Sequence, residues 1–508
     1  MGPNWPGRNI HFETSGLGQE SRLREQDFLR SLGGWREGAG PAYARLADAV
    51  RAAIEAGEVP PGAKIPAERT LAQMLSVSRT TVVAAYEKLR HDGWLESRQG
   101  SGTRARRPGS GSPALAHEGG AAAAHRIYRV LAEPHAGMVE FLAAHLPGAG
   151  VLTDVILRAS LESAQDWTRE PGYYPLGLPE LRRVVARYLT RSGLPSTEEQ
   201  VLITSGAQQA IALAASLLVR RGDAVVLEDP TYLGAVDVFQ SLGANLVPVR
   251  VGKEGVDFSL LAEVMRRGAP RFVYLMPTYQ NPTGTLMPER QRRQLAKISE
   301  QLQIPILEDN TLAELWIQGE PPPPIGAFSS KAPILTVGSL SKLFWGGLRV
   351  GWIRAAEPII ARLAPVKTMS DLGSSVLSQT AALTLFKDVD RIRTMRRREC
   401  AARMEELTAE LKKQLPSWTW DPPAGGLALW IKLPYGNAPE FARVAHRHGV
   451  SVLPGNFASP EGRFADRLRL PFVLEAATMK EGIARLARAW AAYAPASKAE
   501  KKRVGVLV

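Results

Sequence analysis

Three features are scarce or missing in this sequence of 508 residues, and each absence narrows the class of protein. There is a single cysteine, Cys400, which excludes a disulfide framework and favours a reducing, cytoplasmic location. The first forty residues contain arginines but no apolar core, so no secretory signal peptide is expected. The longest apolar run, residues 210–219, has about half of the roughly 20 residues that a bilayer-spanning helix needs. We therefore expect no membrane partner, and we also expect no bound metal.

The charge is unbalanced in favour of basic residues. Lysine and arginine number 63 against 50 aspartate and glutamate residues, which gives a net charge of +13. Such a surplus attracts phosphate groups, but a basic enzyme would carry it equally well, so charge alone does not indicate nucleic-acid binding. With 45% hydrophobic and 22% charged residues the composition is that of a globular protein, and the length suggests about three domains.

Changes in composition divide the chain into five segments. Residues 1–39 are polar and aperiodic and are predicted to form an irregular arm, whereas residues 40–107 are dense in helical patterns. Residues 108–135 are rich in proline, glycine, serine and alanine, which is typical of a linker. From 136 to 495 short apolar strands alternate with longer helices, and residues 496–508 form a short basic tail.

The pattern in residues 40–107 predicts three helices and a wing. Apolar residues recur at helical spacing over 43–56 and 65–75, and a third helix is predicted to begin at the N-cap Ser78. The second and third helices are joined by only a few residues, which suggests a helix-turn-helix. The third helix of the segment would then present Arg79 and backbone amides to phosphates or guanine edges. A plain three-helix bundle fits the periodicity equally well. The residues predicted to face the core include Leu46, Val50, Leu71, Met74, Leu75, Val82, Tyr86 and Leu89.

A resemblance decides between these two interpretations. The run PAERTLAQMLSVSRTTVVAAYEKLRHDGWLESRQGSGT, residues 66–103, resembles the winged helix-turn-helix of GntR-type transcription regulators. The resemblance implies that the module binds a double-stranded DNA operator and that its wing tip enters the minor groove. The DNA contacts that it implies are Arg69, Ser78, Arg79, Thr80 and Thr81 in the helices and Gln99 and Gly100 at the wing tip.

The larger segment has the pattern of an α/β protein. Short apolar runs begin at Val201, Ala224, Arg271, Ile304 and Pro333, and most of them alternate with helices. This pattern predicts a mostly parallel sheet that is covered on both faces. In such sheets ligands bind beyond the carboxyl ends of the strands. Several of these strands end in residues with useful chemistry.

Some of these residues suit an anion. The sequence Ser205-Gly206-Ala207-Gln208 leads directly into a predicted helix, whose first amides lack partners and can hold a phosphate. Ser339, Ser341 and Arg349 add hydroxyl groups and a guanidinium that suit the same anion.

Other residues suit an aromatic aldehyde. Lys342 lies among small residues, where its amine could form a Schiff base, and Asp309 ends a buried strand, where a pyridinium nitrogen could pair with it. Tyr232 offers a ring for stacking and Asn281 offers an amide to a phenolic oxygen. Each residue alone is better explained as a surface lysine, a helix cap or a core residue. Taken together in this order, they describe a site for pyridoxal 5′-phosphate (PLP).

The same region resembles fold-type I, aminotransferase-like proteins over some 350 residues. The matching stretches include GLPELRRVVARYL, ITSGAQQAI, PTYQNPTG, SLSKLFWGGLRVGW and RLPF. The resemblance implies a Schiff base between Lys342 and PLP, and a substrate carboxylate on Arg469 that Arg467 could share. It also implies a site at a dimer interface, where Tyr173 or Tyr174 reaches the partner. The cofactor-binding residues that it implies are Gly206, Ala207, Gln208, Tyr232, Asn281, Asp309, Ser339 and Arg349.

Two positions depart from the family pattern. Members usually have a tyrosine two or three residues after the aspartate, where it bonds the phenolic oxygen, but Thr311 and Leu312 occupy these positions here. Gly346 replaces a proline that is common before Gly-Leu-Arg. Loss of the tyrosine would weaken transamination, whereas Asn281 is retained as in true aminotransferases.

A GntR-type module that is linked to an aminotransferase-like domain is the arrangement of the MocR-type regulators, which the chain resembles over roughly residues 40–495. This implies a homodimer that senses PLP, or an amino compound forming an external aldimine with it, and changes its operator binding accordingly. Two alternatives stay open: an active aminotransferase, which converts an amino acid to a 2-oxo acid, and a structural dimeriser without a cofactor. The arginine-rich stretch 391–398 suggests a solvated or interdomain helix rather than a second nucleic-acid patch, because helical spacing spreads its charges around the helix.

Overall fold

The computed structural model describes residues 28–29, 31–33, 35, 40–56, 58–59, 63–92, 94–98, 102–105, 127, 137–148, 150, 152–155 and 168–504. The chain divides into two compact units, one ending at His117 and the other beginning at Glu118. Most of the predicted arm 1–39 and linker 108–135 lies outside the described residues, and so do Gln99 and Gly100. None of the described helices is long and apolar enough to cross a bilayer.

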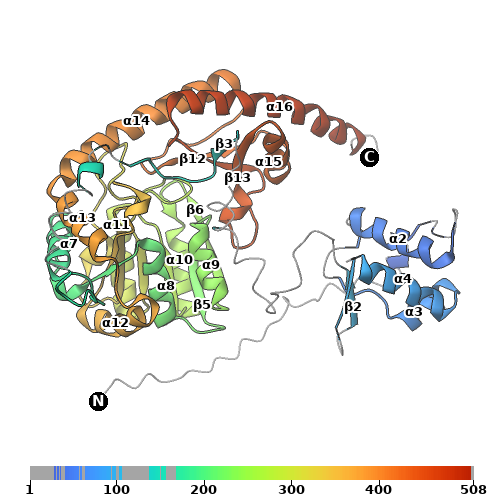
Figure 1. Cartoon of the computed structure of the whole chain (residues 1–508), viewed down its shortest axis with the longest axis horizontal. Helices are drawn as coiled ribbons and strands as arrows, with labels where there is room; N and C mark the ends of the chain where they lie inside the picture. The colour runs from blue at the N-terminus through green and yellow to red at the C-terminus, as the bar shows by residue number, and fades with distance from the viewer. Residues whose placement is uncertain are drawn as a thin grey trace, which may run out of the picture. The chain divides into compact units, whose positions relative to one another are not determined.

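Among its described residues, the amino-terminal unit contains the helices α2, α3 and α4 and a two-stranded wing (Figure 1). Its elements are α2 (Ala42–Ala56), α3 (Glu68–Leu75), α4 (Arg79–His91) and the antiparallel strands β1 (Leu95–Arg98) and β2 (Gly102–Ala105). The residues predicted to face the core are buried, except Met74, which is only partly buried. Helix α3 ends where Ser76 takes a left-handed conformation (φ 52°), and α4 begins two residues later at the N-cap Ser78. The predicted helix-turn-helix and wing are therefore confirmed.

The second unit is built on an eight-stranded sheet with the strand order β4-β11-β10-β9-β8-β5-β6-β7. The strands are β4 (Val201–Thr204), β5 (Ala224–Asp229), β6 (Asn245–Gly252), β7 (Gly255–Val256), β8 (Phe272–Leu275), β9 (Ile306–Asp309), β10 (Ile334–Ser339) and β11 (Gly351–Arg354). Strands β10, β9, β8, β5 and β6 pair in parallel, as predicted. Strand β11 is antiparallel to both of its neighbours, because the short connection from β10 cannot accommodate a crossover.

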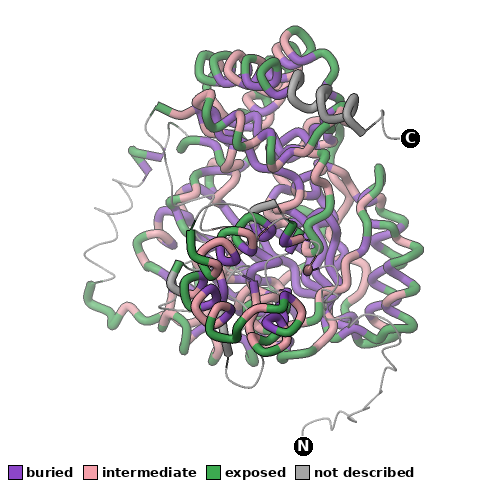
Figure 2. The backbone as a smooth tube through the Cα atoms, turned by 90° about the vertical axis from the view of Figure 1, so that its right-hand side faces the viewer, coloured by how far each residue is buried: buried purple, intermediate pink, exposed green. Residues whose placement is uncertain are grey.

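Helices cover both faces of this sheet. Val225 and Leu227 pack in one apolar cluster with residues of α8 and α9, whereas Val226 between them packs in another with α10 and α11. This alternation buries the strands from both sides, and Figure 2 colours buried residues purple. Cys400 is buried in the first cluster, so it is a packing residue as predicted. The covering helices are α7 (Pro179–Arg191), α8 (Ala207–Leu218), α9 (Leu233–Ser241), α10 (Phe258–Gly268), α11 (Glu289–Leu302), α12 (Glu357–Asp371) and α13 (Val376–Lys387).

A second, four-stranded sheet was not predicted. It has the order β12-β14-β13-β3, and β3 (Val139–Phe141) is the first strand after the predicted linker. It packs with long helices that lie over it in Figure 1. These elements are β12 (Ala428–Lys432), β13 (Val450–Pro454), β14 (Arg467–Pro471), α14 (Val389–Gln414), α15 (Ala438–Arg447) and α16 (Ala476–Val504).

Candidate PLP site and DNA interface

A cavity of about 600 Å³ opens beyond the carboxyl ends of the parallel strands and brings the predicted site residues together. Gly206 lies just behind the wall, since a Cβ on it would stand 2.9 Å from Nη2 of Arg349. Arg467 does not line the cavity, so Arg469 is the arginine of β14 that reaches it. The predicted residues in the wall are Ala207, Gln208, Tyr232, Asn281, Asp309, Ser339, Ser341, Lys342, Arg349 and Arg469.

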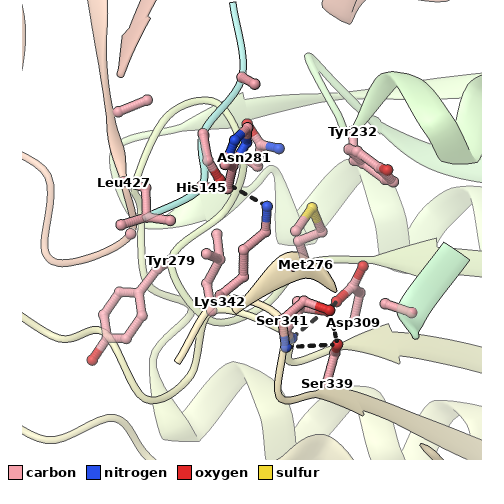
Figure 3. A pocket seen from close by; sticks show the side chains of 18 of the residues that line it. His145, Tyr232, Met276, Tyr279, Asn281, Asp309, Ser339, Ser341, Lys342 and Leu427 are labelled. Atoms are coloured by element: carbon pink, nitrogen blue, oxygen red, sulfur yellow. Dashed lines mark hydrogen bonds between the residues drawn. The ribbon is translucent and has the colours of Figure 1, made fainter. Parts of the chain in front are cut away.

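Lys342 follows β10 and extends across the cavity. Figure 3 shows Ser339, Ser341 and Asp309 grouped on one side of it and Leu427 on the other. Its Nζ donates a hydrogen bond to the carbonyl oxygen of Ala144 at 2.7 Å. Desolvation, together with the positive charges of Arg469 and Arg349, lowers the pKa of Lys342 to about 8. A large fraction of this amine can therefore be neutral near pH 8, as a nucleophile requires.

The residues predicted for an anion form one cradle. Gly206 caps helix α8 with a φ of 108°, which strongly favours glycine, and the first amides of α8 lack acceptors within the helix. The hydroxyls of Ser339 and Ser341 are 3.0 Å apart, and the amide of Ser341 donates to Oγ of Ser339 at 3.1 Å. The guanidinium of Arg349 lies against Gly206. Amides, hydroxyls and a guanidinium on one small space suit a phosphate.

Asp309, at the end of β9, accepts hydrogen bonds on both carboxylate oxygens. Oδ2 accepts from the hydroxyl of Tyr274 at 3.0 Å, and Oδ1 accepts from the amide of Thr311 at 2.9 Å and from its hydroxyl. Thr311, which replaces the family's tyrosine, thus donates hydrogen bonds to the carboxylate of Asp309. Burial raises the pKa of Asp309, and the described part of the chain offers it no ion pair. A cationic ligand would meet a buried carboxylate here.

A backbone segment crosses the cavity and holds both of its inner cations. We name residues 142–147, which follow β3, the entry strap. The carbonyl of Leu142 accepts from Nη2 of Arg469, and that of Ala144 accepts from Lys342. Arg469 also contacts Oδ1 of Asn281 at 3.4 Å, while its buried Nε has no hydrogen-bond partner among the residues that the structure describes. Burial lowers the pKa of Arg469 to about 10.

Arg396, from the arginine-rich stretch, is buried rather than solvated. Its guanidinium donates to the carbonyls of Leu343 and Phe344, which follow Lys342, and to that of Pro147 in the entry strap. It therefore ties the lysine loop to the strap, which contradicts the expectation of a solvated residue at this position.

The DNA-facing candidates lie on the surface of the amino-terminal unit. Arg69 and Arg79 border a shallow hollow between α3 and α4, and the Gln73 side chain lines it as well. The side chains of Arg69, Ser78, Arg79 and Thr80 are exposed, and Thr81 is partly buried. Oγ of Ser78 accepts from the amide of Thr81 at 3.1 Å and lies 2.8 Å from the hydroxyl of Thr80. Ser78 is therefore the N-cap of α4.

Comparison with known proteins identifies both units. The family model of aminotransferase class I and II matches residues 144–486, and that of bacterial regulatory proteins of the gntR family matches residues 42–104. The chain belongs to the class I and II aminotransferase family and carries a gntR-type DNA-binding module. Both resemblances inferred from the sequence are confirmed.

Relatives share the whole arrangement. The uncharacterized HTH-type transcriptional regulator YisV of Bacillus subtilis is 32% identical, with 84% of this chain and 92% of that protein covered. The probable rhizopine catabolism regulatory protein MocR of Rhizobium meliloti is 30% identical, with 89% and 94% covered. The structure of LysN, an α-aminoadipate aminotransferase of Thermus thermophilus complexed with N-(5′-phosphopyridoxyl)-L-leucine, has a TM-score of 0.66 and 29% identity, and covers 72% of this chain and 94% of LysN. This MocR-type regulator therefore has an aminotransferase-like domain of a PLP-dependent fold.

Several residues at the site left no recognisable signal in the sequence. Tyr274 lies within an apolar strand and looked like a core residue. The entry strap contributes carbonyl oxygens, which every residue has, so no side-chain pattern marks it. His145, within the entry strap, lines the cavity, and partial burial together with the charge of Lys342 lowers its pKa. Tyr173 and Tyr174 do not line the cavity, and their predicted contact with a partner stays a prediction.

Proposed function

We propose that this MocR-type regulator binds a double-stranded DNA operator and that the occupant of its PLP cavity changes this binding. The occupant is PLP, or an amino compound bonded to it. The observation that carries the proposal is the combination, in one chain, of an exposed helix start suited to DNA and a cavity with a lysine, an anion cradle and a buried carboxylate. A ligand changes operator binding only if it binds two conformations of the protein unequally.

The cavity residues fit PLP in chemistry and position. PLP supplies an aldehyde that bonds reversibly to amines and a ring that withdraws electrons. The cradle of Gly206, Ala207, Gln208, Ser339, Ser341 and Arg349 would hold its phosphate, and Tyr232 would stack on the ring. Asp309 would pair with the ring nitrogen, which would give the buried carboxylate the cation that it lacks. Asn281 would donate to the phenolic oxygen, and Lys342 would bond to the aldehyde carbon.

Arg469 is the candidate for the carboxylate of an amino compound. Its Nη2 donates a hydrogen bond to the carbonyl of Leu142, and within the described part of the chain its buried Nε has no partner. A carboxylate that bound the guanidinium through two oxygens would satisfy Nε and replace the neutral carbonyl by a charged acceptor. Binding of the effector would thereby release one bond between the domain and the entry strap.

A homodimer would place two DNA modules together. Leu372 and Leu377 are more than half exposed, and Met369 is 89% exposed, so α12 and α13 present an apolar patch to solvent. Such a patch suits a subunit interface, and two modules would recognise paired half-sites. Tyr173 or Tyr174 would then reach the partner's phosphate. The DNA partner also favours a cytoplasmic location.

On the DNA module we propose Arg69 and Arg79 as the principal contacts. Both are exposed and border the same hollow, and Arg79 opens α4, where free amides also suit phosphates. Thr80 and Thr81 follow on the first turn, and Ser78 supports them through its hydroxyl. Gln99 and Gly100 would complete the interface at the wing tip.

Fluorescence anisotropy tests the proposal. The purified protein is titrated onto a labelled duplex from upstream of its own gene, with a scrambled duplex at the same salt concentration as the control. Each titration is run without ligand, with PLP, and with PLP plus amino compounds. A preference for the native duplex that shifts with a ligand is the expected result. Equal, weak binding to both duplexes under all conditions contradicts the proposal.

A second candidate is an active aminotransferase that carries a DNA module. It is favoured by Asn281, Lys342 and Arg469 lining one cavity, and by the resemblance to LysN, whose name describes an aminotransferase. Turnover of an amino donor with a 2-oxo acid by the purified protein would support it. A third, a cofactor-free dimeriser, predicts that Lys342→Ala changes neither visible absorbance nor any ligand response.

A further inference from the structure

Ile127 belongs to the predicted linker 108–135, yet it lines the cavity of the aminotransferase-like domain. Its backbone N–H donates a hydrogen bond to Oδ2 of Asp237 at 3.0 Å. Asp237 is buried in α9, where an unpaired carboxylate would be costly. The contact therefore fixes one described point of the linker to the wall of the ligand site.

The place of this contact is defined by helix α9. Asp237 is four residues after Leu233, which puts the two residues on the same face of the helix, one turn apart. Leu233 and the preceding Tyr232 both line the cavity, as Ile127 does. Ile127 therefore borders the cavity at the end where Tyr232 is proposed to stack on the cofactor.

The chain meets the cavity a second time soon after Ile127. Beyond β3, the carbonyls of Leu142 and Ala144 hold Arg469 and Lys342. Ile127 of the linker and the entry strap of the domain thus border the ligand site at two places. A ligand that engages Lys342 and Arg469 acts on one of them, and a ligand that reaches the Tyr232 end acts on the other.

The charged side chains that line the cavity limit which part of an effector can contact Ile127. Among the described residues of the wall, the acidic and basic side chains other than His145 are Asp309, Lys342, Arg349 and Arg469. PLP and the effector carboxylate account for all four in the proposed function, and the lowered pKa of His145 favours its neutral form. The remaining side chain of the effector would meet mostly apolar and neutral groups, such as Ile127 and Leu233.

We propose that Ile127 is a specificity-determining residue that the linker contributes to the effector site. It selects an amino acid with an apolar side chain, and Asp237 positions it by holding its N–H. The inference rests on the proposed function and deepens it. The linker residue whose side chain selects the effector is also the residue through which the presence of the effector is reported to the linker. Loss of the Asp237 contact uncouples ligand binding from DNA binding.

The test compares variants by the ratio of operator affinities with and without ligand, each variant serving as its own ligand-free reference. The ligands are PLP alone and PLP with L-leucine, L-lysine or L-glutamate, and the readout is anisotropy on the upstream duplex. For the wild type, L-leucine is expected to change the affinity by about tenfold, within the usual range of such coupling, and the charged amino acids much less. Ser241→Ala, at the exposed end of α9, is the matched control and should respond as the wild type does.

Asp237→Ala and Ile127→Ala should bring the L-leucine ratio close to 1, whereas Asp237→Asn should keep most of the response, because its amide oxygen can still accept from Ile127. Hydrogen exchange of the Ile127 amide is a second measurement, and it should be faster in Asp237→Ala than in Asp237→Asn. If the wild type responds and both alanine variants respond equally, the inference fails and the proposed function stands. A response to charged amino acids alone also overturns it. If the wild type responds to no ligand, the proposed function itself fails.

Discussion

Lys342 should take up PLP with a pH dependence that reports its unusual environment. Only the neutral amine can bond to the aldehyde carbon, so the rate of covalent uptake by the PLP-free protein follows the neutral fraction of Lys342. With a pKa of about 8, roughly a tenth of the amines are neutral at pH 7 and roughly nine tenths at pH 9. The rate should therefore rise about tenfold over this interval and level off above it.

An ordinary lysine would behave differently. At the usual lysine pKa of 10.5 only about 0.03% of the amines would be neutral at pH 7, and the rate would rise about a hundredfold by pH 9 without levelling off. Stopped-flow absorbance follows the formation of the covalent complex of PLP with Lys342 and gives the rate of uptake at each pH. Lys342→Ala gives the baseline without covalent uptake. A rate that still climbs steeply between pH 9 and 10 would refute the reasoning.

Removing a neighbouring charge provides an independent check. The positive charge of Arg469 contributes to the low pKa of Lys342 because it disfavours a second cation nearby. Arg469→Met should therefore raise the pKa of Lys342 and move the plateau to higher pH. A plateau that stays at the same pH in this variant would mean that the charge of Arg469 does not act on the amine.

Three further predictions follow from the same structure. Gly206→Ala should weaken PLP affinity about tenfold or more in an absorbance titration, because the new Cβ is strained at φ 108° and lies 2.9 Å from Nη2 of Arg349. Burial raises the pKa of Glu228 to about 8, so its contribution to stability is present below pH 4.5 and is lost as the pH rises through 8. Glu228→Gln should remove this loss, which is at most about 4 kcal/mol of unfolding free energy at pH 8. Thermal unfolding of both proteins as a function of pH measures it. Arg79→Ala should lower operator affinity about tenfold to a hundredfold and reduce the salt dependence of anisotropy titrations.

Much of the fold could be predicted because its elements carry local signals. The five predicted strands are short, apolar runs, and each of them is a strand of the large sheet. Strand β3 has only three residues and pairs with Val450–Val452, some three hundred residues later, so nothing in the local sequence marks it. The other strands of the second sheet, β12, β13 and β14, have five residues each, so their length does not explain why this sheet was not predicted. The antiparallel direction of β11 depends on a connection length rather than on composition.

The site divides in a similar way. Lys342 and Asp309 could be predicted because charged side chains at the ends of apolar strands carry a chemical signal, whereas Arg469 was predicted only from the resemblance to aminotransferase-like proteins. The contacts that hold them could not be predicted, because Lys342 and Arg469 donate hydrogen bonds to backbone carbonyls, which every residue type has. Thr311 was identified as a departure from the family pattern, but only the structure shows that it bonds to Asp309.

The most direct test of the account is the reciprocity of DNA and ligand binding. If the cavity and the DNA module are coupled, the factor by which a ligand changes operator affinity must equal the factor by which the operator changes ligand affinity. The affinity for PLP, and that of the PLP-loaded protein for L-leucine, would be measured by absorbance with and without a saturating upstream duplex. The account predicts that at least one affinity changes with the duplex, by the same factor that anisotropy gives for that ligand. Identical affinities for both ligands with and without DNA would contradict it.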